Sequence, residues 1–543
     1  MGGRGLRRGG AAAGGLLRGL SAMSGAGPGD NPVLDLVGAE RLSVPALFAE
    51  RARRSPERPF LRWGDERWSY REVWEETLRF AAWARASGAR PGARVASFLP
   101  NRPETLWAWF GSLAAGATYV PLNRAHRGEI LADMIARSGA RVLVTDAEGR
   151  RDLPDLSGSS VETVLLAEEW DEVRALDPAE PAPPAPGELA ELMYTSGTTG
   201  RSKAVQLSHE QLCRGAGWVA WSLEMTEEDV FHAWLPLFHI AGQADTVLPA
   251  IVAGGSVALY PTFSRSGFWD QVRESGSTLF IGFSNIAQLL CSLPRREDDA
   301  GTTLRAGVTG AMPAELSVEF ERRFGVRLHD VYGMTEGEPM ALPRPGERTP
   351  PGSCGRPRPD LELAILDSAG EPLDPGRVGE IAVRPLIPNV LTAGYEGDPE
   401  ATAEATAGGW FHSGDLGRRD AEGFVYFADR ASHSIRRRGE NVSSWELETA
   451  IAAAPGVAEC SAVGVPSPLG EEDVKVAVVA APGATLEPRE LWEWCRERIA
   501  AFMVPRYIEV VAALPRAETG KVMKEELRSL DGEVWDAERG SIP

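Results

Sequence analysis

The chain has 543 residues, of which 43% are apolar and 25% are charged, a balance typical of soluble globular proteins. A single hydrophobic core stops growing at roughly 250–300 residues, so this length indicates more than one domain. The 57 Lys and Arg residues against 77 Asp and Glu residues leave a net charge of -20. That balance argues against a general nucleic-acid binder, which needs a basic face, but is compatible with a local cationic pocket for nucleotide phosphates.

The cysteines and the apolar segments limit the class of protein further. The five cysteines are scattered and show neither Cys-x-x-Cys nor Cys/His spacing, so we expect buried free thiols rather than a zinc site or disulfides. No apolar run approaches the roughly 20 residues of a membrane-spanning helix. These features predict a cytoplasmic protein. Residues 1–31, which begin with a Gly-, Ala- and Arg-rich stretch, are predicted to be a disordered extension, with a targeting segment as the alternative.

From residue 32 onward, helical and strand patterns alternate. The expected elements are helices over 44–55, 70–87 and 103–115, a hairpin of 60–63 with 67–69, and a strand over 94–99. Such alternation predicts layered α/β structure. A Pro- and Ala-rich stretch at 177–187 is interpreted as a surface loop, because a strand over 189–194 then continues the same pattern.

A change of pattern near residues 429–430 predicts a domain boundary. After it we expect a basic turn at 436–439, a helix over 444–454, strands over 460–465 and 474–479, and a helix over 488–501. These elements make an α+β unit of about 110 residues, a normal size for a small domain. The predicted organisation is therefore a disordered extension (1–31), a large N-terminal domain of layered α/β subdomains (32–429) and a small C-terminal α+β domain (430–543).

The segment 194–203 (YTSGTTGRSK) has the composition of a phosphate-binding loop. Glycines let backbone N–H groups approach a phosphate, hydroxyls donate further hydrogen bonds, and the closing lysine adds positive charge. The GxxxxGK[ST] spacing of a Walker A loop is absent. A flexible linker is the alternative, which the preceding strand and the basic end disfavour. The predicted phosphate-contacting residues are Thr195, Ser196, Gly197, Thr198, Thr199 and Lys203.

This loop and four later motifs resemble the adenylate-forming superfamily of acyl-CoA synthetases, peptide-synthetase adenylation domains and luciferases. The later motifs are YGMTE at 332–336, a ribose motif at 410–430, the opening of a mobile C-terminal domain at 437–448, and a lysine loop at 515–521. The resemblance covers residues 40–530 and implies that the protein activates a carboxylic acid with ATP, giving acyl-AMP and pyrophosphate. The small domain then rotates, and the acyl group passes to coenzyme A. In form the sequence is most similar to stand-alone small- and medium-chain acyl-CoA ligases, including the carnitine/crotonobetaine type.

The resemblance also implies roles for the nucleotide-binding residues. Tyr332 stacks on adenine, Thr335 donates to the α-phosphate, and Glu336 holds Mg²⁺ through a hard oxygen ligand. Asp415 accepts hydrogen bonds from the ribose hydroxyls, and Arg430 reaches ribose or phosphate. Taken singly, each residue type has a structural alternative: a core tyrosine, a solvated carboxylate, a turn residue or a surface ion pair.

Three further residues are implicated in the reaction itself. Lys521 points at the carboxylate and α-phosphate and stabilises the charge that builds during adenylation. His239, in LPLFHIAG, is expected to position or gate the acid rather than to transfer protons. Gly439 is expected to line a narrow tunnel for the coenzyme A thiol. The implied cofactors are therefore ATP, Mg²⁺ and, as co-substrate, coenzyme A.

The sequence departs from the family at two places. Ser202 and Ala204 stand where the family usually has proline and glycine around the retained lysine, which predicts a slightly more mobile loop. Ser432 and His433 stand where the hinge usually carries Lys-Asp, which bears on the detail of domain rotation.

Two alternative functions share some of these features. The first is an adenylating ligase with another acceptor, such as a carrier protein or an amine, or with an unusual acid such as an inorganic oxyanion. The second is a nucleotide-binding regulator without catalysis, which the retained Lys203, Glu336, Asp415, Arg430 and Lys521 disfavour. The acid pocket is expected near His239, 283–287, 307–312 and 334–339, and long-chain, aromatic and short branched acids all remain open.

Overall fold

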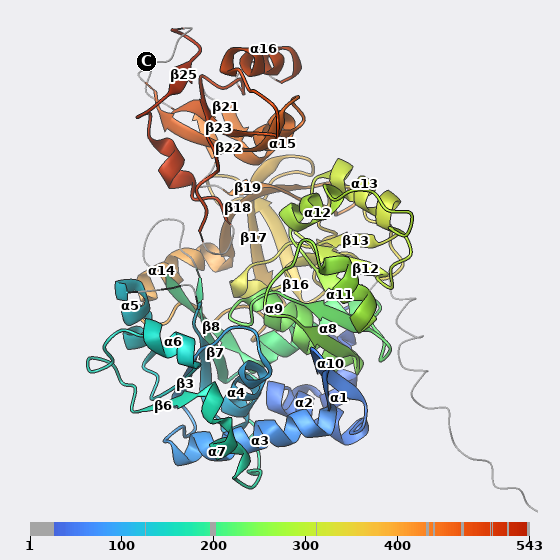
Figure 1. Cartoon of the computed structure of the whole chain (residues 1–543), viewed down its shortest axis with the longest axis vertical. Coiled ribbons are helices and arrows are strands. Elements are labelled where there is room, and N and C mark those ends of the chain that lie inside the picture. The colour runs from blue at the N-terminus through green and yellow to red at the C-terminus, as the bar shows by residue number, and fades with distance from the viewer. Residues whose placement is uncertain are drawn as a thin grey trace, which may run out of the picture. The chain divides into compact units, whose positions relative to one another are not determined.

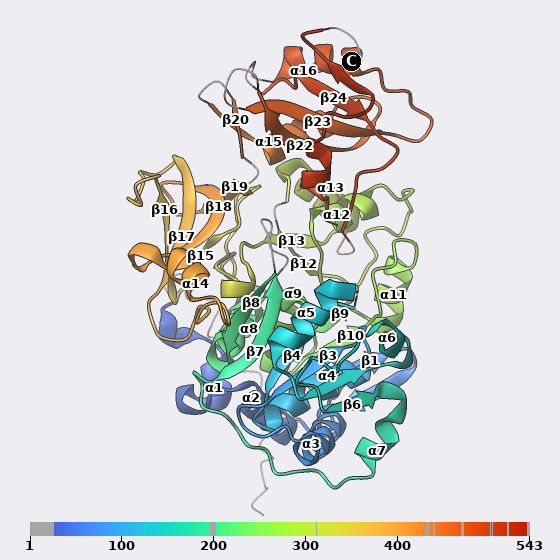
Figure 2. The ribbon, with the colours of Figure 1, turned by 90° about the vertical axis from the view of Figure 1, so that its left-hand side faces the viewer.

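The computed structural model of the chain is shown in Figure 1 and Figure 2. It describes residues 26–124, 126, 128–195, 202–310, 312–430, 434–437, 440–467, 472–499, 501, 503–517 and 521–539. The chain divides into two compact units. The first comprises Met1–Leu363, Val383–His412 and Glu422–Val425, and the second comprises Ala364–Ala382, Ser413–Ala421 and Tyr426–Pro543.

A largely parallel sheet forms one layer of the first unit. Its strand order is β13-β12-β11-β9-β10-β1-β2, and only the β1–β2 pairing is antiparallel among the described residues. The strands are β1 (Pro59–Trp63), β2 (Glu66–Ser69), β9 (Val230–Ala233), β10 (Ser256–Leu259), β11 (Leu279–Ile281), β12 (Ala306–Thr309) and β13 (Arg327–Asp330). Parallel strands are normally buried on both faces, which fits the four fully buried positions of β12.

A second sheet of the same unit leads to the predicted phosphate loop. Its order is β6-β5-β3-β4-β7-β8, parallel up to β7 and antiparallel between β7 and β8. The strands are β3 (Arg94–Phe98), β4 (Thr118–Pro121), β5 (Val142–Thr145), β6 (Thr163–Leu166), β7 (Leu189–Thr195) and β8 (Lys203–Ser208), several of which are visible side by side in Figure 2.

Helices connect the strands and fill the space around the two sheets. They are α1 (Val33–Val37), α2 (Val44–Arg54), α3 (Tyr70–Ala86), α4 (Pro103–Ala114), α5 (Gly128–Ser138), α6 (Ala147–Asp152), α7 (Trp170–Arg174), α8 (His209–Ser222), α9 (Ile240–Gly242), α10 (Leu248–Ala253), α11 (Phe268–Ser275), α12 (Ser284–Cys291), α13 (Ala314–Phe324) and α14 (Pro399–Ala405). A π-helical turn, Gln243–Val247, lies between α9 and α10. Among the described residues, no helix has the length and apolarity needed to cross a membrane.

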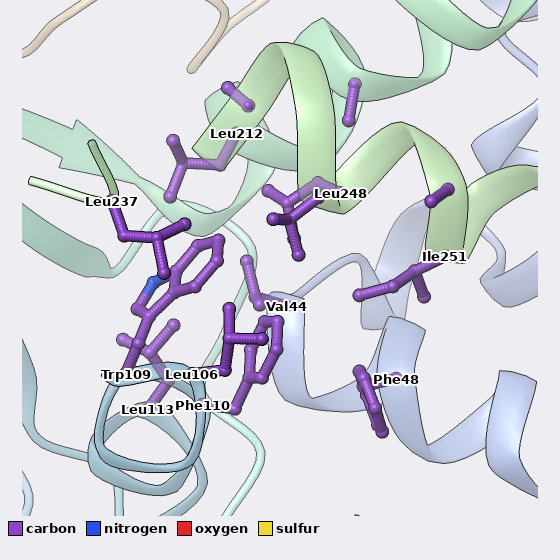
Figure 3. Close-up of a cluster of buried hydrophobic side chains, with 14 of the residues drawn as sticks. Val44, Phe48, Leu106, Trp109, Phe110, Leu113, Leu212, Leu237, Leu248 and Ile251 are labelled. Atoms are coloured by element: carbon purple, nitrogen blue, oxygen red, sulfur yellow. The ribbon is translucent and has the colours of Figure 1, made fainter. Parts of the chain in front are cut away.

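The largest hydrophobic core joins both sheets through helices α2, α4, α8 and α10. Figure 3 shows its centre, where side chains from these helices meet: Val44, Phe48, Leu106, Trp109, Phe110, Leu113, Leu212, Leu248 and Ile251, together with Leu237. The same core includes Val95 and Tyr119 of one sheet and Phe231 and Val257 of the other. Packing of this density fixes the position of α8 and of the π-helical turn relative to both sheets.

The second unit is built around another sheet. Its order is β22-β23-β24-β25, from β22 (Val457–Pro466), β23 (Glu472–Ala480), β24 (Tyr507–Val510) and β25 (Val534–Asp536). The unit is completed by helices α15 (Ser444–Ala452) and α16 (Pro488–Arg498) and by the antiparallel pair of β20 (Ser434–Arg437) and β21 (Glu440–Ser443). Its core includes Ile435, Val442, Leu447, Ile451, Val474 and Val476.

A further sheet has the order β16-β17-β18-β19, from β16 (Leu361–Leu366), β17 (Val378–Pro385), β18 (Phe411–Arg419) and β19 (Val425–Arg430). A small pairing joins β14 (Ala341–Leu342) to β15 (Arg356–Pro357).

The α/β class predicted from the sequence is confirmed, and the expected elements agree with the observed ones within a few residues. Helix α3 illustrates the local cause, since Ser69 and Glu72 form a capping box in which Ser69 N–H donates to Glu72 Oε2 at 2.7 Å. Within the predicted extension, Pro28–Asp30 form a 3₁₀ turn and Asn31 is buried.

Glu191 places a carboxyl group inside the core of the first unit. It lies on β7, the strand that leads to the predicted phosphate loop, and it is fully buried. Its Oε1 accepts a hydrogen bond from Trp109 Nε1 at 2.6 Å. Burial raises the pKa of this carboxyl to about 8, so it keeps its proton at neutral pH.

We expect Glu191→Gln to change how stability depends on pH. In the unfolded chain this group releases its proton near its usual pKa of 4.5, whereas the folded protein keeps it until about pH 8. The unfolded state therefore binds fewer protons between these values, and the wild type loses stability as the pH rises through that window. Glutamine keeps the acceptor for Trp109 and cannot ionise, so the melting temperature of the variant should exceed that of the wild type by more at pH 8 than at about pH 5. Equal differences at the two pH values would contradict the assignment.

Candidate active site

The predicted phosphate loop connects two antiparallel strands. Strand β7 ends at Thr195 and β8 begins at Lys203, and these two residues are paired across the ladder. Thr195 Oγ1 donates to the backbone carbonyl of Lys203 at 3.4 Å. The predicted contact residues Ser196, Gly197, Thr198 and Thr199 lie outside the described residues. The flanks already differ from a Walker A loop, in which a strand leads into a helix.

The motif at 332–336 follows strand β13. Tyr332 is buried and pairs with Ala341 through backbone hydrogen bonds, and Thr335 opens a short 3₁₀ turn, Thr335–Gly337. Glu336 is 8% exposed. Its backbone carbonyl accepts hydrogen bonds from Gln211 Nε2 at 3.0 Å and from the Thr392 N–H at 2.8 Å. Segments distant in sequence therefore fix the backbone that carries this carboxylate.

Tyr395 links two of the predicted site residues and was not identified from the sequence. Its hydroxyl donates to Glu336 Oε1 at 2.9 Å, and Lys203 Nζ lies 4.6 Å from the centre of its ring. Burial, followed by the negative charge of Glu336, raises the pKa of Tyr395, so the hydroxyl stays a donor. One tyrosine thus brings the lysine of the phosphate loop and the predicted magnesium ligand to the same place.

The side chains around Glu336 fit a magnesium ion. Within the part of the chain that the structure describes, no group of three or more His, Cys, Asp or Glu residues could hold a metal by itself. Mg²⁺ in nucleotide enzymes is typically held by one or two carboxylates together with substrate phosphates, and it keeps several waters. A single buried carboxylate beside a phosphate loop meets that requirement, so Glu336 is the residue that would hold Mg²⁺.

His239 caps the short helix α9. Its Nδ1 accepts a hydrogen bond from the Ala241 N–H at 3.3 Å. A ring nitrogen that accepts carries no proton, so the proton of the neutral ring is assigned to Nε2. The helix cap fixes the orientation of this imidazole, and its role in positioning the acid stays a prediction.

Four predicted site residues belong to the second unit: Asp415, Arg430, Gly439 and Lys521. The structure describes the side chains of Asp415 and Lys521. Asp415 lies on β18 directly after Gly414, whose φ is 67°, and it is 4% exposed. Its backbone N–H donates to Ser413 Oγ at 3.1 Å. Arg430 ends β19, but its side chain and the whole of Gly439 lie outside the described residues.

Lys521 lies in the C-terminal part of the second unit. Its side chain is exposed, and its backbone carbonyl accepts from the Ala517 N–H at 2.8 Å. Lys524, three residues later, differs because its Nζ lies 3.0 Å from Glu448 Oε1 and donates to Ser444 Oγ at 2.7 Å. Lys524 thus has a structural partner within its own unit.

Comparison with known proteins identifies the family. The chain matches the model described as AMP-binding enzyme over residues 48–395, and the model described as AMP-binding enzyme C-terminal domain over residues 446–521. A feruloyl-CoA synthase of Amycolatopsis sp is 35% identical over 486 residues, which are 88% of this chain and 97% of that protein. A crotonobetaine/carnitine–CoA ligase of Salmonella heidelberg (strain SL476) is 34% identical over 484 residues, 85% of this chain and 93% of that protein.

Solved structures agree with this match. The crystal structure of ATP-bound MatB from Rhodopseudomonas palustris superimposes with a TM-score of 0.82 at 28% identity, over 89% of this chain and 98% of that chain. The o-succinylbenzoate CoA synthetase MenE of Bacillus subtilis, solved with its acyl-adenylate intermediate, gives a TM-score of 0.78 at 27% identity, with the same coverage of 89% and 98%. Because the family model spans more than half of the chain and the relatives match it almost end to end, the chain belongs to the AMP-binding enzyme family and is of the acyl-CoA synthetase type.

Proposed function

We propose that this protein activates a carboxylic acid with MgATP, releases pyrophosphate and transfers the acyl group from acyl-AMP to coenzyme A. The observation that carries the proposal is the cluster of Lys203, Tyr395 and Glu336 at the end of the phosphate loop. In this cluster, Lys203 would contact phosphates and Glu336 would bind magnesium. The chain that carries it matches both AMP-binding models.

In the first half-reaction, a carboxylate oxygen of the acid attacks the α-phosphorus, and the bond to the pyrophosphate oxygen breaks. Mg²⁺, when bound, would neutralise part of the negative charge on the phosphates. Thr335 would donate to the α-phosphate, Glu336 would hold the metal, and Lys521 would meet the negative charge that builds in the transition state. Tyr332 and Asp415 would orient the adenine and the ribose. Positioning and charge stabilisation dominate such a step, as they do in other phosphoryl transfers.

In the second half-reaction, the thiol sulfur of coenzyme A attacks the acyl carbon and releases its proton to solvent, and AMP leaves with the electron pair of the acyl–oxygen bond. Lys521 and Gly439 both belong to the small domain. Rotation at a hinge near residues 429–430 would therefore move Lys521 away from the active site and bring Gly439 to it. His239 would keep the acid in place through both steps. Arg430, next to the hinge, would reach the ribose or a phosphate of the nucleotide.

The role of Lys521 can be tested by separating the half-reactions. We expect Lys521→Ala to lower pyrophosphate release at least about a hundredfold, because a preorganised charge-stabilising group is removed. Formation of acyl-CoA from supplied acyl-AMP should stay close to the wild-type rate. Lys524→Ala is the matched control, since its ammonium pairs with Glu448 and its loss should lower the melting temperature without separating the two steps. An equal loss of both half-reactions in Lys521→Ala would refute the assignment.

Substitutions can separate the two contacts that Tyr395 makes. Tyr395→Phe keeps a ring for Lys203 but removes the donor to Glu336, and a hydrogen bond to a charged group contributes about 1.5–3 kcal/mol. We therefore expect MgATP to bind at least about tenfold more weakly by calorimetry, while ATP without Mg²⁺ binds as in the wild type. Tyr395→Leu should weaken both ligands, because it also removes the ring face. Unchanged MgATP affinity in Tyr395→Phe would exclude a positioning role.

The acceptor can be tested through Gly439. A side chain at this position would intrude into the predicted thiol tunnel, so Gly439→Leu should block acyl-CoA formation and spare acyl-AMP formation. Mass spectrometry of the products distinguishes the two steps, and circular dichroism shows whether the variant is folded. If the wild type makes acyl-AMP but passes the acyl group to an amine or a carrier thiol instead, coenzyme A is not the acceptor.

A further inference from the structure

An irregular segment, residues 234–239, follows strand β9 at the carboxyl edge of the largely parallel sheet. The motif at 332–336 follows β13 of the same sheet, and the two strands between them, β12 and β11, run parallel to both. The two segments therefore leave the same edge of the sheet, and at this edge open α/β sheets bind their ligands. Three strand spacings of about 4.8 Å separate β9 from β13, which is roughly 14 Å.

The side chains of this segment alternate between the core and the surface. Leu235 and Leu237 are buried in the largest hydrophobic core, where Figure 3 shows Leu237. Pro236 and Phe238 are half-buried, and His239 is exposed. An extended chain has this period of two residues. The two leucines therefore anchor the segment, and the other side chains face away from the core.

Asn101 satisfies backbone groups of the segment. It lies between β3 and α4 and is 5% exposed. Its Oδ1 accepts from the Leu237 N–H at 2.9 Å, and its Nδ2 donates to the Leu235 carbonyl at 2.9 Å. Nδ2 also donates to the carbonyl of Tyr260, the residue after β10, at 3.1 Å. One buried amide thus joins the chain segments that follow two neighbouring parallel strands.

Gln243 holds the same residue of the segment from its other side. It is fully buried on the π-helical turn, and its Nε2 donates to the Leu237 carbonyl at 2.6 Å. Glu191, which accepts a hydrogen bond from Trp109, also forms a side-chain hydrogen bond with Gln243. Buried backbone groups need partners, and an irregular segment has no ladder to supply them. For Leu237, buried side chains supply the partners of both the N–H and the C=O.

Short backbone contacts connect this arrangement to His239. The His239 N–H donates to the Pro236 carbonyl at 3.0 Å, and the Gly242 N–H donates to the His239 carbonyl at 3.0 Å. Gly242 packs so closely on the segment that a Cβ atom there would lie 2.3 Å from the Pro236 oxygen. The backbone of His239 therefore cannot shift unless residues 235–237 shift with it.

We propose that Asn101 and Gln243 are positioning residues for the acid, because they fix the backbone of Leu237 and, through it, the exposed imidazole of His239. This inference rests on the proposed function, in which His239 keeps the acid in place, and it identifies the two buried amides that act through that histidine. A displacement of about 1 Å in a positioning group can lower a rate about a hundredfold, so loss of either amide should affect the acid and spare the nucleotide.

The first test separates the acid from the nucleotide by pyrophosphate release. The probe is the acid that the wild type converts best from a panel that includes octanoate, benzoate and 3-methylbutanoate. We expect Asn101→Ala to lower kcat/KM for this acid at least about tenfold, because the Leu237 N–H loses its buried acceptor. KM for MgATP should stay within about twofold of the wild type. Gln243→Leu should behave in the same way and provides a second variant if one of the two does not fold.

The second test distinguishes positioning from a general loss of stability. His239→Ala should lower kcat/KM for the acid by itself, and adding Asn101→Ala should lower it little further, because Asn101 acts through His239. Tyr70→Phe is the matched control, since the buried Tyr70 hydroxyl donates to the carbonyls of Ala250 and Gly255. It should lower the melting temperature and leave kcat/KM for the acid unchanged.

Hydrogen exchange measured by mass spectrometry needs no acid. Peptides that cover residues 234–242 should exchange faster in Asn101→Ala and at the wild-type rate in Tyr70→Phe. With a wild type that releases pyrophosphate, the inference alone is overturned by any of three results: an unchanged kcat/KM for the acid in Asn101→Ala, an equal loss for MgATP, or full additivity with His239→Ala. Faster exchange in Asn101→Ala, in a protein that releases no pyrophosphate with any acid of the panel, would instead count against the proposed function.

Discussion

Arg358 and Asp360 form a fully buried ion pair, with 2.5 Å between Nε and Oδ1. The same guanidinium donates to the carbonyls of Glu338 and Pro339, just after the 332–336 motif, and to that of Val390, five residues before Tyr395. It therefore ties together the two chain segments that supply Glu336 and its hydrogen-bond donor. Removing one partner of a buried ion pair costs about 3–5 kcal/mol, and here it would also release the backbone on which the site is built.

Two further contacts connect this buried ion pair and the Glu338 backbone to the hydrophobic core. Trp218 Nε1 donates to Asp360 Oδ2 at 2.8 Å, which joins the ion pair to helix α8. Gly215, on the same helix, lies so close to the Glu338 carbonyl that a Cβ atom would approach it within 2.4 Å. Helix α8 in turn packs in the core shown in Figure 3. The position of Glu336, the predicted magnesium ligand, thus depends on the hydrophobic packing of helix α8, to which the buried Arg358–Asp360 ion pair connects it.

The sequence predicts the elements well and the site only in part, for physical reasons. Helix α3 and the β1–β2 hairpin are set by local patterns, so their bounds can be predicted within a few residues. Tyr395 could not be predicted to contact Glu336, because 59 residues separate them and only the tertiary fold brings them together. Asp245, whose side chain hydrogen-bonds to Glu338, lies on a π-helical turn, which shifts side-chain directions in a way that a 3.6-residue period does not reveal.

Tyr395 contacts two charged side chains of the proposed nucleotide site with unequal strength. Lys203 contacts the face of its ring, and a cation–π contact of this kind contributes only about 0.5–1 kcal/mol at an exposed site. Glu336 receives a hydrogen bond from its hydroxyl, a stronger and directional contact. An ammonium held weakly can leave for a phosphate at little cost, since the phosphate offers a full opposite charge. In the proposed reaction, the weak contact would let Lys203 move to a phosphate, while the stronger one would keep the Glu336 carboxylate in place for a metal.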